Sequence, residues 1–211
     1  MQISNVLRDM ILKLELEPGA VISKDDVARA FGVSSMPVRE ALRKLEEEGL
    51  VVIKPQSGTY VTTIDVRWAK EAQFLRIGVE AEVVRHLVKT ITEPEIQELE
   101  RILAHQQVEY EAGDKEGFSR DDAAFHAAMY RMVGVGGLWK KIGAMRAHID
   151  RLRLMHLPVG GKMSRILADH RAIVDGIRTR DAEAAEAALR QHLSGTLSFI
   201  ETLRERYPHY F

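Results

Sequence analysis

The chain has 211 residues, no cysteine and a formal net charge of −1. The missing cysteines exclude disulfide bonds, thiol nucleophiles and cysteine-type zinc sites, and the balanced charge gives no general sign of a nucleic-acid partner. No apolar run reaches the roughly 18 residues that a membrane span needs, and the first residues read as neither a signal nor a transit peptide. We therefore expect a cytoplasmic protein without a membrane partner.

The first part of the chain, residues 1–64, opens with two helical patterns. Apolar residues at three- and four-residue spacing predict a first helix from Ser4 to about Leu14, which Pro18-Gly19 ends. Ser23 is a good N-cap for a second helix. Two short helices separated by a turn are therefore expected before residue 33.

A third helix and a hairpin complete this first part. Ser34 is a good N-cap and Gly49 a good C-cap for the third helix, and β-rich runs on both sides of residues 55–58 predict the hairpin. This order of elements is that of a winged helix-turn-helix, in which the third helix enters the major groove and the wing reaches the backbone or minor groove. We therefore expect residues 1–64 to bind double-stranded DNA.

Residues 65–211 are almost entirely helix-periodic. The predicted helical segments span residues 65–89, 92–112, 114–133, 137–156, 162–179 and 181–206. Short connections between their apolar stripes indicate an antiparallel all-α bundle, so the fold class is mainly α. The absence of βαβ alternation, a phosphate-binding glycine loop and a Gly-x-Ser-x-Gly elbow argues against nucleotide enzymes and α/β hydrolases.

Residues 32–49, GVSSMPVREALRKLEEEG, resemble the recognition-helix segment of GntR-type transcriptional regulators. The resemblance extends back to residues 16–19 and forward through residues 58–61, and the helical remainder resembles the sensing domain of the FadR subfamily. It therefore covers essentially the whole chain and implies a ligand-responsive regulator.

The resemblance also implies which residues contact DNA. The family's contact positions correspond here to Ser34, Ser35, Arg39, Ser57 and Gly58. The chain departs from the family pattern at Ser35, where a basic residue is common, and at Asp25, where an arginine is common. Lys24 is adjacent and can take over that role, so these departures concern the operator sequence more than DNA binding itself.

Arg39 also has an argument that does not depend on the resemblance. Because the apolar stripe of the third helix turns inward, Arg39 and Arg43 share its more solvent-facing side. A guanidinium there can bridge O6 and N7 of guanine or hold a phosphate. The alternative is a surface ion pair with Glu46 or Glu47 at helical spacing.

Three helical segments of the second part each direct one histidine toward an apolar stripe. They are His126, His170 and His192, and Asp122 lies one turn before His126. For any single histidine, a hydrogen bond to a carboxylate or a carbonyl is the simpler explanation. Three of them on three helices are harder to satisfy separately, and imidazoles with a carboxylate are ordinary ligands for Zn²⁺, Ni²⁺ or Mn²⁺.

The resemblance points to the same four residues. Many sensing domains of the FadR subfamily have an Asp-x-x-x-His pair and two later histidines as a metal site, an arrangement that Asp122, His126, His170 and His192 match. Members without these ligands bind acyl-CoA, so this ligand set argues against that branch. A divalent metal ion is therefore the expected cofactor.

An effector site is expected beside the metal. Four protein ligands on an octahedral ion leave two positions for a small carboxylate, and an arginine pairs well with such a ligand. Arg76 resembles the family's Arg-x-x-Leu-Glu run, although an ion pair with Glu80 is the alternative. His148 has apolar neighbours and can line the same cavity, while Arg151 and Arg153 are weaker candidates.

These patterns together predict a homodimeric, metal-containing transcription factor that binds a pseudo-palindromic operator. We expect this factor to be a repressor rather than an activator. The first alternative is a metal-dependent enzyme with an accessory winged domain, because an open metal position can activate water. Glu80 is the only general base that the sequence offers for such an enzyme. The second alternative is a helical interaction protein whose histidines only pack in the core.

Overall fold

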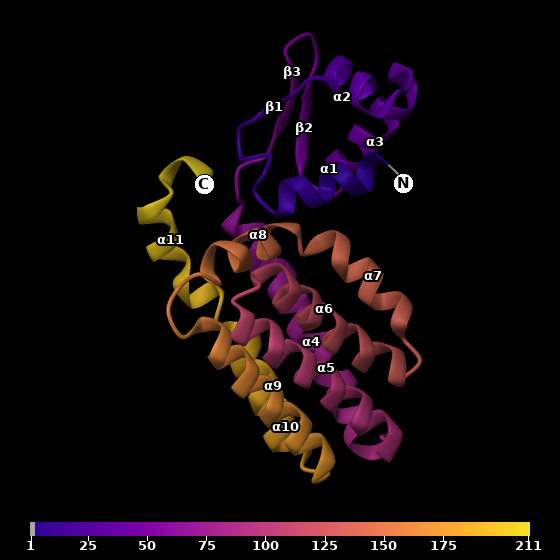
Figure 1. Cartoon of the computed structure of the whole chain (residues 1–211), viewed down its shortest axis with the longest axis vertical. Coiled ribbons are helices and arrows are strands. Elements are labelled where there is room, and N and C mark those ends of the chain that lie inside the picture. Colours follow the sequence, from indigo (N-terminus) through magenta and orange to yellow (C-terminus); the bar gives the residue numbers. More distant parts are fainter. Residues whose placement is uncertain (1–2) are drawn as a thin grey trace. The chain divides into compact units, whose positions relative to one another are not determined.

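The structure is a computed structural model that describes residues 3–211, apart from the side chain of Ala144. The chain divides into two compact units. The first consists of Met1–Lys70, Ala144–Met155 and Ile200–Phe211, and the second consists of Glu71–Gly143 and His156–Phe199. The first holds a small sheet among helices and the second is helical, so the mainly α fold class is confirmed (Figure 1). The boundary after residue 64 stays a prediction.

The first unit contains the expected winged helix-turn-helix. Its elements are α1 (Ile3–Leu12), β1 (Val21–Ile22), α2 (Lys24–Phe31), α3 (Ser35–Glu47), β2 (Val51–Lys54) and β3 (Gly58–Val61). The strands form an antiparallel sheet in the order β1-β3-β2, in which Tyr60 pairs with Val52 on one side and Val21 on the other. Strand β1 was not predicted, because two residues are too few to show an alternating pattern.

Caps fix the ends of the helices around the turn. Ser23 caps α2 by accepting a hydrogen bond from the amide of Asp26, whereas Ser34 precedes α3 without a side-chain cap bond. Gly49 follows the last turn of α3 with a φ of +71°. The backbone conformation at Gly49 favours glycine, and a Cβ there would lie 3.0 Å from the ring of Trp68, which would have to shift slightly.

Two C-terminal segments complete the first unit, namely α8 (Ala147–His156) and α11 (Ile200–Arg206). Ala147 is buried in the core that Leu7, Leu42 and Leu45 also form. The fully buried Arg151 donates a hydrogen bond to the carbonyl of Thr62 at 2.6 Å. The chain leaving β3 is therefore anchored by residues that lie far along the sequence.

The second unit is a bundle of helices. Its elements are most of α4 (Val66–Thr90), α5 (Glu93–Ala112), α6 (Lys115–Met132), α7 (Gly136–Met145), α9 (Lys162–Arg178) and α10 (Ala182–Ser194). Helix α5 packs against α6 and α9, and α9 packs against α10 (Figure 1). The core between them includes Leu99, Phe125, Met129, Ile173 and Leu189. Among the described residues, none of the helices has both the length and the apolar character to cross a bilayer.

Two of the predicted helices are interrupted. The segment 137–156 divides into α7 and α8, and the segment 181–206 divides into α10, a 3₁₀ turn (Leu197–Phe199) and α11. At the first break the indole nitrogen of Trp68 donates to the carbonyl of Met145 at 3.2 Å. At the second, the side-chain amide of Gln73 donates to the carbonyl of Leu193. Hydrophobic periodicity does not reveal such tertiary partners, so the sequence predicted continuous helices.

Candidate metal centre and nucleic-acid interface

Four buried side chains from α6, α9 and α10 converge in the second unit. Asp122, His126, His170 and His192 each offer a ligand atom, and these atoms all lie within 4.8 Å of one another. Nε2 of His192 lies 3.1 Å from Nε2 of His126 and 3.3 Å from Nε2 of His170. Oxygens of Asp122 lie 3.6 Å from His170 Nε2 and 4.0 Å from His126 Nε2. The structure thus brings all four predicted metal ligands together.

The separation of the imidazole nitrogens fits a shared divalent ion. Two nitrogens that each lie about 2.1 Å from one ion are about 3.0–3.4 Å apart when their bond angle is between a right angle and a tetrahedral angle. The separations of 3.1 Å and 3.3 Å fall in this range. Burial, followed by the neighbouring His170 and His126, holds the pKa of His192 well below its ordinary value. Its ring is therefore neutral, as a metal ligand must be.

The second ring nitrogen of His126 faces a buried carboxylate. Nδ1 of His126 lies 2.7 Å from Oε2 of Glu80, and Oε1 of Glu80 accepts a hydrogen bond of 2.5 Å from Nε of Arg76. Burial by itself would raise the pKa of Glu80, but the charge of Arg76, followed by the neighbouring His126, lowers it to about 2. Glu80 is therefore an anion in the interior of the bundle.

The second ring nitrogens of the other two histidines have different surroundings. Nδ1 of His170 lies 2.9 Å from Oε1 of the buried Gln106, whose Nε2 donates to the carbonyl of Phe118 at 3.2 Å. Nδ1 of His192 lies 3.9 Å from the nearer oxygen of Asp169, which is too far for a hydrogen bond. The three imidazoles thus meet an anion, a neutral amide and a more distant carboxylate.

Aromatic rings and Arg76 form the walls of the site. The ring of Phe125 stacks on His170 with 4.3 Å between centroids, and the ring of Trp139 stacks on His126 at 6.0 Å. The Arg76 guanidinium lies 5.9 Å from the Trp139 ring. Its Nη2 is buried and has no hydrogen-bond partner among residues 3–211. The ion pair of Arg76 with Glu80 therefore exists, but it leaves one nitrogen able to bind a ligand.

His148, the other predicted effector residue, belongs to the first unit. Its Nδ1 accepts a hydrogen bond from the amide of Asp65 and lies 2.9 Å from Nη2 of Arg151. Burial, and then the charge of Arg151, lower the pKa of His148 to about 4. Its contacts link α8 to the start of α4, and none of them supports the effector role predicted from its apolar neighbours.

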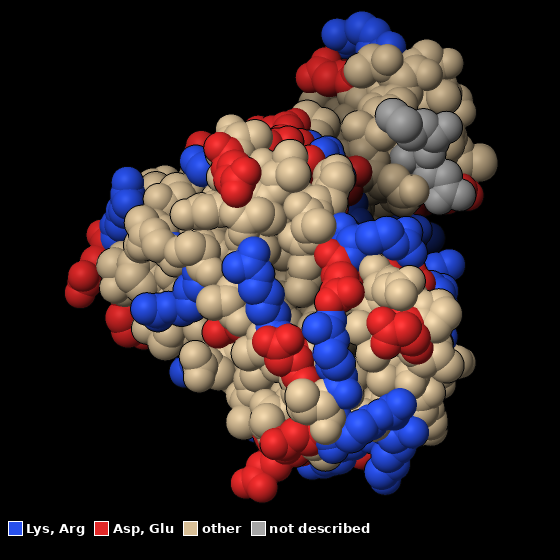
Figure 2. Space-filling model, turned by 60° about the horizontal axis from the view of Figure 1, so that its bottom comes forward, with Lys and Arg blue, Asp and Glu red and all other residues tan. Residues whose placement is uncertain are grey.

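The net charge of −1 gives no general sign of a DNA-binding surface. On the face shown in Figure 2, basic and acidic side chains are mostly interspersed, and several basic side chains group together at its lower right. Any DNA contact must therefore come from a few side chains in defined positions.

The predicted contact residues of the helix-turn-helix lie at its surface. Lys24, Ser34 and Ser35 are exposed, and so are Arg39 and Arg43 on α3. Within the part of the chain that the structure describes, neither arginine forms an ion pair, contrary to the alternative weighed from the sequence.

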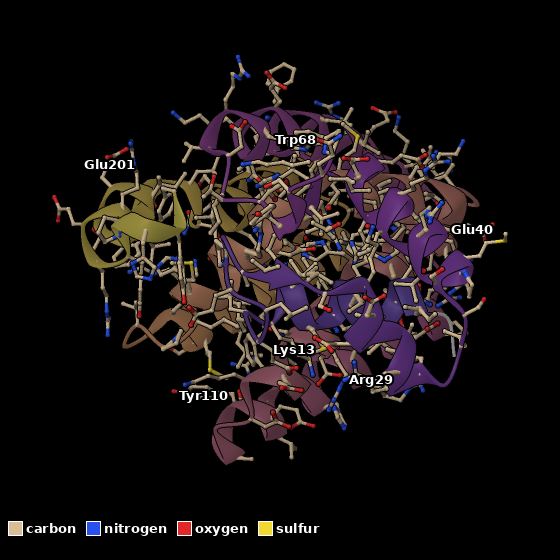
Figure 3. The ribbon with its side chains drawn as sticks, turned by 90° about the horizontal axis from the view of Figure 1, so that it is seen from above. Lys13, Arg29, Glu40, Trp68, Tyr110 and Glu201 are labelled. Atoms are coloured by element: carbon tan, nitrogen blue, oxygen red, sulfur yellow. The ribbon has the colours of Figure 1, made fainter. Side chains whose placement is uncertain are left out.

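Acidic residues on α3 do not neutralise these arginines. Glu46 instead accepts a hydrogen bond of 2.8 Å from the amide of Ile53 on β2. Glu40 lies at the outer edge of α3, and Arg29 of α2 is directed into solvent (Figure 3). The exposed guanidinium groups of α3 are therefore available to an external anion.

The wing has a structured tip. Ser57 is exposed and its hydroxyl lies 3.0 Å from the hydroxyl of Tyr60, while Gly58 has a φ of +133° that favours glycine. The exposed Lys54 lies with its ammonium 5.1 Å from the Tyr60 ring. The sequence analysis overlooked Lys54, although a lysine beside a wing turn is a candidate for a phosphate contact.

The sequence analysis also missed how the metal ligands are held. Gln106 follows Leu99 and Leu103 at helical spacing, so a polar residue at a buried position was the signal that could have revealed it. Glu80 was considered as an ion-pair partner of Arg76 and as a general base, but not as a partner of His126. No periodicity indicates that it faces a histidine of another helix.

Comparison with known protein families covers most of the chain. Residues 1–61 match the family described as bacterial regulatory proteins, gntR family. Residues 71–195 match the FCD domain. The two matches correspond to the winged elements and to the helical bundle.

Curated relatives and solved structures agree with these matches. A regulator of Streptomyces ambofaciens, named as an uncharacterized HTH-type transcriptional regulator in an unstable DNA locus, is 36% identical over 205 residues, which are 97% of this chain and 86% of the relative. The HTH-type transcriptional repressor RspR of Escherichia coli is 31% identical over 210 residues, covering 100% and 92%. Escherichia coli McbR/YncC shares the fold, with a TM-score of 0.80 at 21% identity and 96% coverage of both chains.

The matched families consist of regulators, so the alternative of a metal-dependent enzyme is wrong. The helix-turn-helix has its expected contact residues at the surface, and the bundle holds a cluster of histidines and a carboxylate that can hold a metal ion. The chain belongs to the GntR family of DNA-binding transcriptional regulators and has an FCD domain.

Proposed function

We propose that this regulator is a homodimeric repressor whose FCD domain binds a divalent metal ion together with a small organic acid. The observation that carries the proposal is the convergence of Asp122, His126, His170 and His192 on one buried point. One carboxylate and three neutral imidazoles suit Zn²⁺, Ni²⁺ or Mn²⁺. Relatives named as repressors, including the gluconate operon repressor of Bacillus subtilis at 27% identity, support the direction of control.

The charge of the site favours an anionic effector. The carboxylate of Asp122 balances one of the two charges of the cation, so the occupied site would keep a net positive charge that attracts a carboxylate. Nη2 of Arg76, buried and without a hydrogen-bond partner among residues 3–211, can pair with a second acidic or hydroxyl group of the same ligand. A hydroxycarboxylate or dicarboxylate fits both groups, whereas a neutral sugar uses neither.

The winged unit would read DNA through few side chains. The proposed contacts come from Lys24, Ser34, Ser35, Arg39, Arg43, Ser57 and Gly58. One such unit covers only a short stretch of duplex, so two copies related by a two-fold axis would address a pseudo-palindromic operator. Effector binding would change the affinity for that operator, by about 5–150-fold if the coupling is typical.

Calorimetry on the full-length protein tests the effector site. A panel of hydroxycarboxylates and dicarboxylates should give at least one binder with metal-loaded protein and none after chelation, and neutral sugars should not bind. The same acid should weaken binding to an operator fragment in fluorescence anisotropy. An acid that binds equally well to metal-stripped protein would contradict the proposed sensor.

A further inference from the structure

We propose that Glu80 and Gln106 are positioning residues that fix the tautomers of His126 and His170, so that both present an Nε2 lone pair to the metal. This inference rests on the proposed metal binding. It concerns two buried residues outside the set of four ligands, each from a helix that supplies no ligand, α4 for Glu80 and α5 for Gln106.

The orientation of Gln106 settles which way the proton of His170 points. The amide nitrogen of Gln106 donates to the carbonyl of Phe118, so its oxygen is the atom that faces His170. An amide oxygen only accepts hydrogen bonds, and Nδ1 of His170 must therefore carry the proton. In a neutral imidazole the other nitrogen then has the lone pair. That nitrogen, Nε2, is the one that points to the metal cluster.

Glu80 also determines which ring nitrogen of His126 carries the proton, and it adds a negative charge beside that ring. Its Oε1 accepts the hydrogen bond from Arg76, so the carboxylate is held in place and Oε2 lies 2.7 Å from Nδ1 of His126. This contact is a close approach without hydrogen-bond geometry, but a carboxylate oxygen at 2.7 Å repels an unprotonated ring nitrogen, so the charge of Glu80 favours the proton on Nδ1 and the lone pair on Nε2. An anion behind an imidazole also makes its Nε2 a stronger donor to a cation. Arg76 therefore contributes to the orientation of His126 indirectly, because it holds the carboxylate of Glu80 in place.

His192 offers a comparison inside the same site. An oxygen of Asp169 lies 3.9 Å from Nδ1 of His192, which is too far to fix the orientation of this ring by a hydrogen bond. Nε2 of His192 approaches the acceptor nitrogens of both other histidines, at 3.1 Å and 3.3 Å. With both of those lone pairs fixed, Nε2 of His192 can meet them with its own proton when the metal is absent, or share a cation with them through its lone pair when the metal is bound. The two fixed tautomers thus prepare the site for a cation.

Zinc affinity measured by chelator competition on the full-length protein tests the roles of these residues. Glu80→Gln and Gln106→Met should each bind Zn²⁺ about 10–100-fold more weakly than the wild type, as is common when the outer partner of a ligating histidine is lost. Asp169→Asn, a matched control that also removes a carboxylate near a ligand, should stay close to wild type. Equal zinc affinity in wild type, Glu80→Gln and Gln106→Met would overturn the inference.

A spectroscopic test needs no substitution and is unaffected if a variant fails to fold. In zinc-loaded protein with ¹⁵N-labelled histidine, long-range proton–nitrogen correlation should show a protonated Nδ1 and a zinc-bound Nε2 for His126 and His170. Zinc bound to Nδ1 of either ring would overturn the inference. If the wild type binds no zinc at all, the proposed metal site fails with it, whereas unchanged affinity in the variants refutes the positioning roles alone.

Discussion

The metal cluster and the surface of α3 differ in how far their structure reveals their chemistry. In the cluster, Nδ1 of His126 and of His170 lies 2.7 Å and 2.9 Å from an acceptor oxygen. On α3, Arg39 and Arg43 are exposed and form no ion pair within the described residues. A buried polar group without a partner costs about 1–3 kcal/mol, whereas water satisfies an exposed one in any orientation. Geometry therefore constrains the chemistry of the buried site, while the exposed surface needs its partner to be interpreted.

The largest effect is expected where the buried site loses a ligand. His170→Ala removes one imidazole and leaves a gap beside Phe125, so metal content measured by mass spectrometry should fall strongly. Thermal stability should fall as well, because a ligand at 100 times its Kd stabilises the native state by about 2.7 kcal/mol. His86→Ala, an exposed histidine of α4, should leave both unchanged. Full metal content in the alanine variants of His126, His170 and His192 would exclude the cluster as a metal site.

The pH dependence of stability extends the comparison to a buried histidine of the first unit. The pKa of His148 in the folded protein is about 4, below the value of 6.5 for the unfolded chain, so the unfolded state binds the proton first. The neutral His148 therefore contributes fully to the free energy of unfolding above pH 6.5. This contribution, on the order of 3 kcal/mol, is lost as the pH falls toward 4.

Denaturant unfolding at several pH values checks this effect. His148→Asn keeps an acceptor near the position of Nδ1, so the contact with the amide of Asp65 can persist without a titrating group. The stability difference between wild type and variant should therefore shrink on acidification from pH 7 to pH 4.5. A difference that stays constant over this range would show that His148 is not held neutral by burial.

A smaller effect is expected on the exposed surface. Arg39→Ala should weaken binding to the native operator by about 1–3 kcal/mol if the guanidinium contacts a base, and it should barely change folding. Arg29→Ala is the matched control, because Arg29 is exposed on α2 and forms an ion pair with Asp26. Wild-type operator affinity in Arg39→Ala, measured by fluorescence anisotropy, would remove this side of α3 from the interface.

The smallest effect concerns the wing. Lys54→Ala should lower operator affinity uniformly across DNA sequences, and it should reduce the slope of log affinity against log salt by about one unit. A salt series measured on operator and unrelated DNA distinguishes this from a base contact. A loss of affinity for the operator alone, with unrelated DNA bound as in the wild type, would instead indicate that Lys54 contacts bases.

The sequence predicted the inward histidines well because their apolar neighbours recur on the same helix. His126, His170 and His192 could be placed on buried faces by counting three and four residues. Their outer partners could not be found in this way, because Glu80 and Gln106 come from other helices and are determined by tertiary packing. The divided helices were missed for the same reason, since each break coincides with a contact to a distant segment. Strand β1 was missed because two residues are too few to show an alternating pattern.

The anchoring of Thr62 by Arg151 affects how DNA-binding heads can be exchanged between relatives. A chimaera joined at residue 61, where the GntR match ends, would carry over α3 and the wing but would take α8 from the other parent. Its winged core would then receive a foreign residue in place of Ala147, and the carbonyl of Thr62 would meet a foreign side chain. Such a hybrid should regain stability when residues 147–151 are transplanted together with the head.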